Sequence, residues 1–147
     1  MATARAARSR AAAPDPEPPV LPVPDGELPW TEAELAAVRE ELRGELARLD
    51  GGIAALHATI DDVLRDTGDG VGDDQADSGA KAFEREQEMT LLATVRESRF
   101  QTERALARIA DGTFGSCESC GGPIGKLRLQ AFPRAVLCVG CKQQERR

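Results

Sequence analysis

Aliphatic residues recur with a seven-residue period along the first half of the chain. Two such series interleave, and their members are Leu42, Leu49, Leu56 and Val63 in one and Leu46, Ile53 and Ile60 in the other. Together they give alternating steps of three and four residues, which is the pattern of a coiled-coil seam. The pattern therefore predicts a long amphipathic helix that ends at about Arg65.

The start of this helix carries a capping signal. Thr31 is a good N-cap, Glu34 completes a capping box, and Trp30 with Leu35 forms a hydrophobic staple. Near the middle, the pair Gly51-Gly52 is expected to weaken the helix by about 1 kcal/mol per residue relative to alanine.

A second helix follows a glycine-rich break, "DTGDGVGDDQADSG". Either Asp77 or Ser78 could cap its start, and Gly112 suits the position just after its end at Asp111. Its seam is less regular, because Arg99 and Thr102 interrupt the apolar positions Leu92, Val95, Leu106 and Ile109.

Two helices of similar length joined by a short glycine-rich turn favour an antiparallel hairpin. A parallel coiled-coil dimer is the alternative, but four glycines in the connection favour a true reversal of the chain. We therefore expect a mainly α fold, with a helical hairpin over residues 30–111 and an acidic tip near residues 67–78. A monomer is expected.

Residues 1–29 contain seven of the nine prolines. This density excludes a helix, and we predict a disordered, extended segment. The Arg- and Ala-rich start lacks the apolar core of a secretory signal, although organelle transit peptides have a similar composition. No apolar run approaches the roughly 20 residues needed to cross a bilayer. A cytoplasmic protein without membrane attachment is expected.

The net charge of −6 is unevenly distributed. Residues 31–111 carry ten basic and nineteen acidic side chains, whereas residues 112–147 carry six basic and two acidic ones. The acidic middle section would repel nucleic acid, because phosphate binding depends on Lys and Arg. A protein surface, in particular a basic one, is the expected partner.

All four cysteines lie in residues 112–147, as two C-x2-C pairs separated by seventeen residues: Cys117 with Cys120, and Cys138 with Cys141. This spacing predicts one tetrahedral Zn²⁺ site. Two disulfides, a thioredoxin-type redox pair and an iron–sulfur cluster fit the sequence less well. Four thiolates leave no open coordination position, so the zinc is expected to be structural and the protein not an enzyme.

No other catalytic constellation is present in the sequence. There is no P-loop and no G-x-G-x-x-G motif. The only histidine, His57, lies beside the first seam and is interpreted as a surface residue.

The combination of an acidic helical hairpin and a C4 zinc module resembles the DksA/TraR family of bacterial transcription factors. The stretch "DGTFGSCESCGGPIGKLRLQAFPRAVLCVGCKQ", residues 111–143, carries this resemblance. Within it, "CESCG", "PI", "RLQAFPRA" and "LCVGCK" stand where the family pattern places them. The preceding helices agree with the family in length and order but hardly in residues.

The resemblance implies a specific role. Members of the family bind RNA polymerase without reading a DNA sequence, and their zinc module docks at the rim of the secondary channel. The coiled coil enters the channel, and aspartates at its tip act on initiation, often together with the alarmone ppGpp in the stringent response. Here the tip residues would be Asp74 and Asp77, with Asp73 adding charge. For docking we assign the basic residues of the zinc module: Lys126, Arg128, Arg134 and Lys142.

The tip matches the family motif D-x-x-D-x-A at both aspartates but has Gly79 in place of alanine, with Ala80 next. Glycine loosens the start of the second helix and removes one methyl group.

Two other readings remain open. A GATA-like DNA-binding finger uses a similar cysteine spacing, and the basic C-terminal section permits it, although the attached acidic hairpin opposes it. A non-catalytic adaptor would use the coiled coil to pair with another helix and zinc only as a staple.

Overall fold

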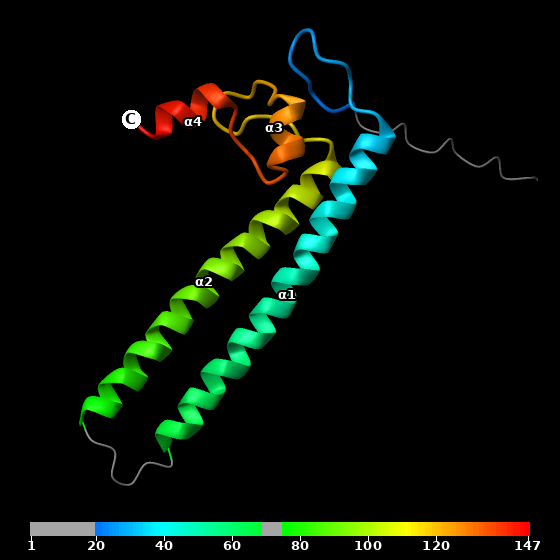
Figure 1. The fold of residues 1–147 in the computed structure, drawn as a ribbon. Coiled ribbons are helices and arrows are strands. Elements are labelled where there is room, and N and C mark those ends of the chain that lie inside the picture. Colours follow the sequence, from blue (N-terminus) through cyan, green and yellow to red (C-terminus); the bar gives the residue numbers. More distant parts are fainter. Residues whose placement is uncertain (1–19, 69–74) are drawn as a thin grey trace, which may run out of the picture.

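The computed structural model describes residues 20–68 and 75–147, and its helices form a hairpin with a compact head at its base (Figure 1). The hairpin consists of α1 (Glu32–Gly68) and α2 (Gln75–Asp111), and the head contains α3 (Lys126–Ala131) and α4 (Val139–Glu145). Ser116 and Pro123 form an isolated antiparallel β-bridge, and the described residues form no β-strand. The predicted mainly α architecture is confirmed.

The capping box at the start of α1 forms as predicted. The backbone N–H of Thr31 donates to the Glu34 carboxylate at 2.8 Å, and the backbone N–H of Glu34 donates to the Thr31 hydroxyl at 3.2 Å. Helical geometry then extends to Gly68 and resumes at Gln75, so each inner boundary lies two or three residues further into the glycine-rich stretch than expected. None of the described helices has the length and hydrophobicity needed to span a membrane.

The polar residues that interrupt the predicted seam of α2 have partners within the hairpin. Thr102 is fully buried, and its hydroxyl donates to the carbonyl oxygen of Ser98 at 2.8 Å. Arg99 forms an ion pair across the hairpin with Asp50 of α1. The contact between the two helices therefore continues through both positions, because Thr102 has a hydrogen-bond partner within α2 and Arg99 has an ion-pair partner on α1.

A left-handed glycine ends α2 and directs the chain into the head. Gly112 has φ +81°, as predicted for the residue after a helix. The backbone N–H groups of Thr113 and Phe114 both donate to the carbonyl oxygen of Arg108, at 3.0 and 2.9 Å. The Asp111 carboxylate accepts from the backbone and hydroxyl of Thr113, and the hydroxyl contact is the main reason that the pKa of Asp111 is lowered.

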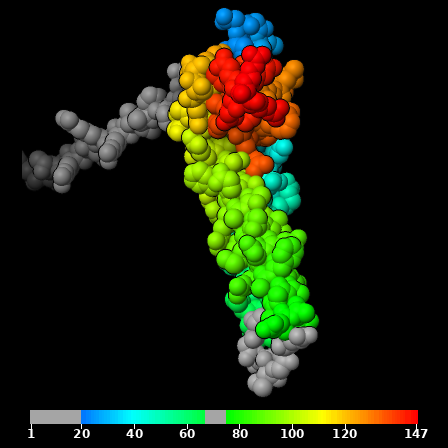
Figure 2. Space-filling view, turned by 90° about the vertical axis from the view of Figure 1, so that its left-hand side faces the viewer, coloured from blue at the N-terminus to red at the C-terminus, as the bar shows by residue number. Residues whose placement is uncertain are grey.

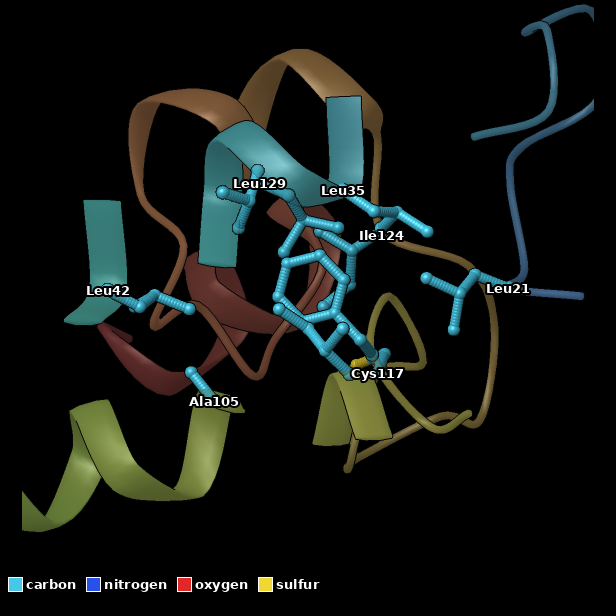
Figure 3. Packing of buried hydrophobic residues seen from close by; sticks show 10 residues of the cluster. Leu21, Leu35, Leu42, Ala105, Cys117, Ile124 and Leu129 are labelled. Carbon is cyan, nitrogen blue, oxygen red and sulfur yellow. The ribbon is translucent and has the colours of Figure 1, made fainter. Parts of the chain in front are cut away.

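The hydrophobic core lies in the head, where the start of α1 and the end of α2 meet the zinc module (Figure 3). Its buried members come from four separate stretches of the chain: Leu21; Leu35, Val38 and Leu42; Ala105 and Ile109; and Phe114, Cys117, Ile124 and Leu129. Trp30 packs edge-on against Phe114, with ring centroids 5.7 Å apart. The head is therefore one packing unit with the base of the hairpin.

Residues 20–29, here called the strap, differ from the expectation of disorder up to residue 29. Leu21 is only 5% exposed and belongs to the head core. The Glu27 carboxylate accepts from the backbone N–H of Lys126 at 2.8 Å. Gly115 makes room for the strap, since a Cβ there would lie 3.0 Å from the carbonyl oxygen of Pro22. Proline excludes a helix, but it does not prevent an extended segment from packing on a core.

Candidate metal centre

The four cysteine thiols converge in the head. Their sulfur atoms all lie within 4.8 Å of one another. Cys117 and Cys120 lie on the turn that follows α2, where the N–H of Gly121 donates to the carbonyl oxygen of Cys117 at 2.8 Å. Cys138 is the N-cap of α4, and Cys141 lies in its first turn. Two short turns therefore present two thiols each to one point.

Backbone N–H groups point at these sulfur atoms. The N–H of Cys138 donates to Cys117 Sγ at 3.3 Å, and the N–H of Cys141 donates to Cys138 Sγ at 3.5 Å. The first of these bonds, with help from the backbone of Cys120 and Ser119, lowers the pKa of Cys117 to about 6 although burial opposes it.

Cys141 shows the opposite behaviour. A hydrogen bond with Ser119 acts to lower its pKa, but contacts with Cys138 and Cys120, burial, and a contact with Cys117 together raise it to about 12. The four thiols therefore do not ionise equally: the Cys117 thiolate forms readily, whereas the Cys141 thiol resists ionisation. Four thiolates at this spacing need a cation among them.

The geometry fits zinc. A tetrahedral ion with Zn–S bonds of about 2.3 Å places its sulfur ligands about 3.8 Å apart, and Cys120 Sγ lies 3.9 Å from Cys138 Sγ. The donor set, four thiolates and no oxygen ligand, also suits this ion. One structural Zn²⁺ held by the cysteine cluster, as predicted, leaves no coordination position for a substrate or a reactive water.

Arg108 joins α2 to the first pair of cysteines. Its guanidinium donates to the carbonyl oxygen of Thr113 at 3.0 Å and also to that of Ser116, and it lies 4.0 Å from the Glu118 carboxylate. Arg104, one turn earlier on α2, pairs with the same carboxylate at 2.6 Å. Sequence reasoning missed this role, although a cation in the last turn of a predicted helix is a known signal for binding nearby carbonyl groups.

Lys126 closes the other side of the head. Its ammonium pairs with the Glu34 carboxylate at 2.8 Å, donates to the Pro29 carbonyl oxygen at 3.3 Å and lies 5.3 Å from the centroid of the Trp30 ring. The hydrogen bond to Lys126 is the main reason that the pKa of Glu34 is lowered. This carboxylate therefore stays ionised to a lower pH than an ordinary glutamate does. The charge of Lys126 thus faces inward, between the strap and α1.

The other basic residues assigned to docking also contact the chain itself. Their partners are the Leu137 carbonyl oxygen at 3.1 Å for Arg128, the Ser98 carbonyl oxygen at 3.3 Å for Arg134, and the Glu145 carboxylate at 2.5 Å for Lys142. Arg128 and Lys142 nevertheless line two hollows of the head surface, with volumes of about 310 and 460 Å³.

At the tip, Asp73 and Asp74 lie outside the described residues. Asp77 is exposed in the first turn of α2. A Cβ at Gly79 would meet no heavy atom within 4 Å, so the alanine of the family motif would fit there.

His57 is exposed on α1, and its Nε2 lies 2.9 Å from an Arg96 guanidinium nitrogen of α2. A neutral His57 would accept this bond at Nε2. Its place on the hairpin surface agrees with the sequence-based interpretation and is remote from the cysteine cluster in the chain.

Comparison with known proteins gives a match between the head and a family model. Residues 112–147 match the model of the prokaryotic DksA/TraR C4-type zinc finger. Over 40 residues the chain is 52% identical to the RNA polymerase-binding transcription factor DksA of Escherichia coli K12, an alignment that spans 26% of that protein.

Two further similarities cover most of the molecule. The RNA polymerase-binding transcription factor DksA of Caulobacter vibrioides NA1000 is 28% identical over 123 residues, which are 84% of this chain and 78% of that protein. The structure of transcription factor DksA2 from Pseudomonas aeruginosa matches with a TM-score of 0.67 and 28% identity, over 78% of this chain and 84% of that one. Hairpin and head therefore occur together in a known architecture.

Proposed function

Because residues 112–147 form a zinc finger of the DksA/TraR family on a hairpin that resembles DksA2, we propose that this protein is a transcription factor that binds RNA polymerase directly. The observation that carries the proposal is that a relative named as an RNA polymerase-binding transcription factor aligns over 84% of this chain, hairpin and head together, while the structure of transcription factor DksA2 has the same architecture. A zinc finger alone would be compatible with many partners.

Within this proposal, the hairpin enters the secondary channel of the polymerase and brings its tip near the active centre. The charge distribution supports this orientation. Residues 31–111 have a net charge of −9, which favours a basic passage and disfavours DNA. The acting groups at the tip would be the carboxylates of Asp74 and Asp77, with Asp73 beside them.

The head would dock outside the channel. We retain Arg128, Arg134 and Lys142 as docking residues and assign Lys126 to the internal contact with Glu34, because its side chain is only 12% exposed. We propose no catalytic activity, since the four-thiolate site has no open position. Under this proposal the protein acts on RNA polymerase in the cytoplasm, and ppGpp is the small molecule whose joint action we test.

The test is an initiation assay with purified RNA polymerase, with and without ppGpp, together with a direct binding measurement. The variant Asp74→Asn/Asp77→Asn removes two tip charges. We expect it to bind polymerase as the wild type does and to lose the effect on initiation. The matched control Asp61→Asn/Asp62→Asn removes two charges from the exposed surface of α1 and should keep that effect.

Wild-type protein that neither binds polymerase nor alters initiation would contradict the proposal. Tight, sequence-specific binding to naked DNA at physiological salt would favour the GATA-like alternative instead. An adaptor would show the reverse ordering, in which the tip variant stays active and Leu56→Asp, a seam change, abolishes function.

A further inference from the structure

We propose that residues 1–13 of this chain dock on an exposed side of α2 and shield it from other partners. The docking surface, here called the α2 face, is a shallow hollow of about 630 Å³, and its lining residues are Phe83, Glu86, Gln87, Glu88, Thr90, Leu91 and Thr94. All of them belong to α2, so α1 leaves the hollow open. The contact lies within the chain and goes beyond the proposed function.

Two large apolar side chains of the α2 face are open to solvent. Phe83 is 70% exposed and Leu91 is 48% exposed. They are eight residues apart, a spacing that places both on one side of a helix. Figure 2 shows the rod from the side on which α2 lies in front, and below the head no described segment covers α2 there. Exposed apolar side chains that gather in one patch mark an interaction surface.

Charge selects the occupant of the α2 face. Glu86 and Glu88 are the only charged residues that line it. Its partner should therefore be cationic, with apolar groups for Phe83 and Leu91. The hairpin of a second copy is disfavoured, because residues 31–111 have a net charge of −9.

Residues 1–13 have the required chemistry. They contain three arginines, seven alanines and no acidic residue, and they lie outside the described residues. An arginine pairs with a carboxylate through its guanidinium, which also stacks on aromatic rings, and it lays its aliphatic stem on apolar side chains. Residues 14–29 carry four acidic side chains and no basic one. The basic charge is therefore concentrated in residues 1–13.

The segment starts from a fixed point on the head. Leu21 is buried in the same core as Ile109, near the end of α2. The residue before it, Val20, is 90% exposed, so the chain leaves the head at its surface. Residues 1–19 are therefore tethered beside the base of the hairpin. A short tether raises the effective concentration of the two partners to about millimolar, so a contact too weak for separate molecules is populated.

The tether is long enough. Phe83 lies twenty-six residues before Ile109, which is about 39 Å along a helix at 1.5 Å per residue. Arg5 lies sixteen residues before Leu21, and that length of chain spans at most about 53 Å at 3.3 Å per residue. The difference exceeds the helix diameter of about 10–12 Å. The arginines can therefore reach the whole of the α2 face.

Docking would give the hairpin two states. With residues 1–13 in place, the carboxylates of Glu86 and Glu88 are neutralised and the apolar patch is covered. Under the proposed function this arrangement opposes entry of the hairpin into a basic passage. Residues 1–13 must then leave the α2 face before entry, and this consequence rests on the proposed function.

The first experiment uses the full-length, zinc-loaded protein alone, with a photo-reactive phenylalanine analogue in place of the exposed Gln87. We expect crosslinks to residues 1–13 within one molecule, with a yield that does not depend on protein concentration. The yield should fall as salt is raised to about 1 M, where the Debye length is about 3 Å. The matched control places the same analogue at Ala58, an exposed position of α1, and should give little of this product.

Charge variants test the chemistry of the contact. Arg5→Glu/Arg8→Glu/Arg10→Glu should lower the crosslink yield by about fivefold or more, because like charges then meet at the α2 face. The same three changes to lysine should keep it within about twofold. Glu86→Lys/Glu88→Lys should also abolish the product, whereas Asp61→Lys/Asp62→Lys, at exposed positions of α1, should not. Equal yields from positions 87 and 58, crosslinks between molecules, or equal losses in the two lysine pairs would overturn the inference.

The second experiment measures shielding with purified RNA polymerase. Arg5→Ala/Arg8→Ala/Arg10→Ala should bind about threefold more tightly than the wild type, because the open state no longer competes with the docked one. Unchanged or weaker binding would overturn the shielding. If the wild type does not bind polymerase, the proposed function fails, and the crosslink decides the docking of residues 1–13 independently.

Discussion

Two arginines of α2 show how burial decides how much a charged side chain contributes to stability. Arg104 and Arg108 both approach the Glu118 carboxylate, but their side chains are 49% and 9% exposed. Water screens the first pair, and such pairs contribute little to stability. Arg108 also donates to two backbone carbonyl groups in the turn before the first cysteine. If Arg108 were removed, the Thr113 carbonyl would keep the backbone N–H of Ser116 as a donor, whereas the Ser116 carbonyl would lose its hydrogen bond to the guanidinium.

Arg108→Met should therefore lower the free energy of unfolding by about 2–4 kcal/mol, through the loss of its charged hydrogen bonds and the unsatisfied, half-buried Ser116 carbonyl. Arg104→Met should lower it by less than about 1 kcal/mol. Urea denaturation of the zinc-loaded proteins, followed by far-UV circular dichroism, measures both. Equal losses in the two variants would contradict this account.

The zinc ligands could be predicted from the sequence, whereas the residues that hold the head together could not. Each C-x2-C pair is a local pattern whose geometry follows from its own turn. Arg108 and Lys126 act through partners that only the folded chain brings near, such as the Ser116 carbonyl and the Glu34 carboxylate. A sequence shows that these residues are basic, but it does not show which way they face.

At the scale of elements, α1 contains glycines that its packing does not require. A Cβ at Gly51 would meet no heavy atom within 4 Å, and one at Gly52 would meet only Val95 Cγ1, at 3.9 Å. Gly112 is different, because its φ of +81° is a conformation that side chains disfavour. The first two glycines lower helix stability without making room for a neighbour.

Gly51→Ala and Gly52→Ala should each stabilise the protein by about 0.5–1 kcal/mol, because alanine restricts the unfolded chain and favours the helix. Gly112→Ala is the opposite control and should destabilise it by about 1 kcal/mol or more. Urea midpoints at constant zinc concentration give the comparison. If the first two variants are destabilised, α1 has a bend at this point that side chains do not tolerate.

The hairpin was predictable because its signal is periodic and repeated. Leu42, Leu56 and Ile60 belong to interleaved heptad series in α1. In α2, one hydrogen bond to the preceding turn is enough to let Thr102 lie within the seam. The strap has no period. Leu21 stands among prolines, and only its burial in a core made from distant residues identifies it as structured.

At the scale of the molecule, an acidic rod and a basic head share one core, and the cysteine cluster borders it: Cys117 belongs to the core, and Cys138 and Cys141 pack against it. The only tryptophan, Trp30, reports on it, because its ring contacts Phe114 and Lys126 and its Nε1 is buried. Structural zinc in small domains contributes about 10–16 kcal/mol of folding free energy. Loss of the ion should therefore open the contacts between strap, head and hairpin base.

Chelation of zinc should shift Trp30 emission to longer wavelength as the ring becomes hydrated. Fluorescence and far-UV circular dichroism measure the change, and a colorimetric zinc indicator gives the amount released. Renewed addition of Zn²⁺ should restore the emission, whereas Mg²⁺ should not, because it prefers oxygen ligands. Unchanged emission after complete release would show that the core does not depend on the ion.

The position of the strap also sets an order of events during synthesis. Leu21 packs in a core that Cys138 and Cys141 also contact, and Cys141 is made 120 residues after Leu21. At 5–20 residues per second the ribosome needs roughly 6–24 s for that length. Throughout this interval Leu21 and the apolar base of α1 have no finished core to join. The nascent chain must therefore stay soluble through its charged helices until the second pair of cysteines emerges and captures the ion.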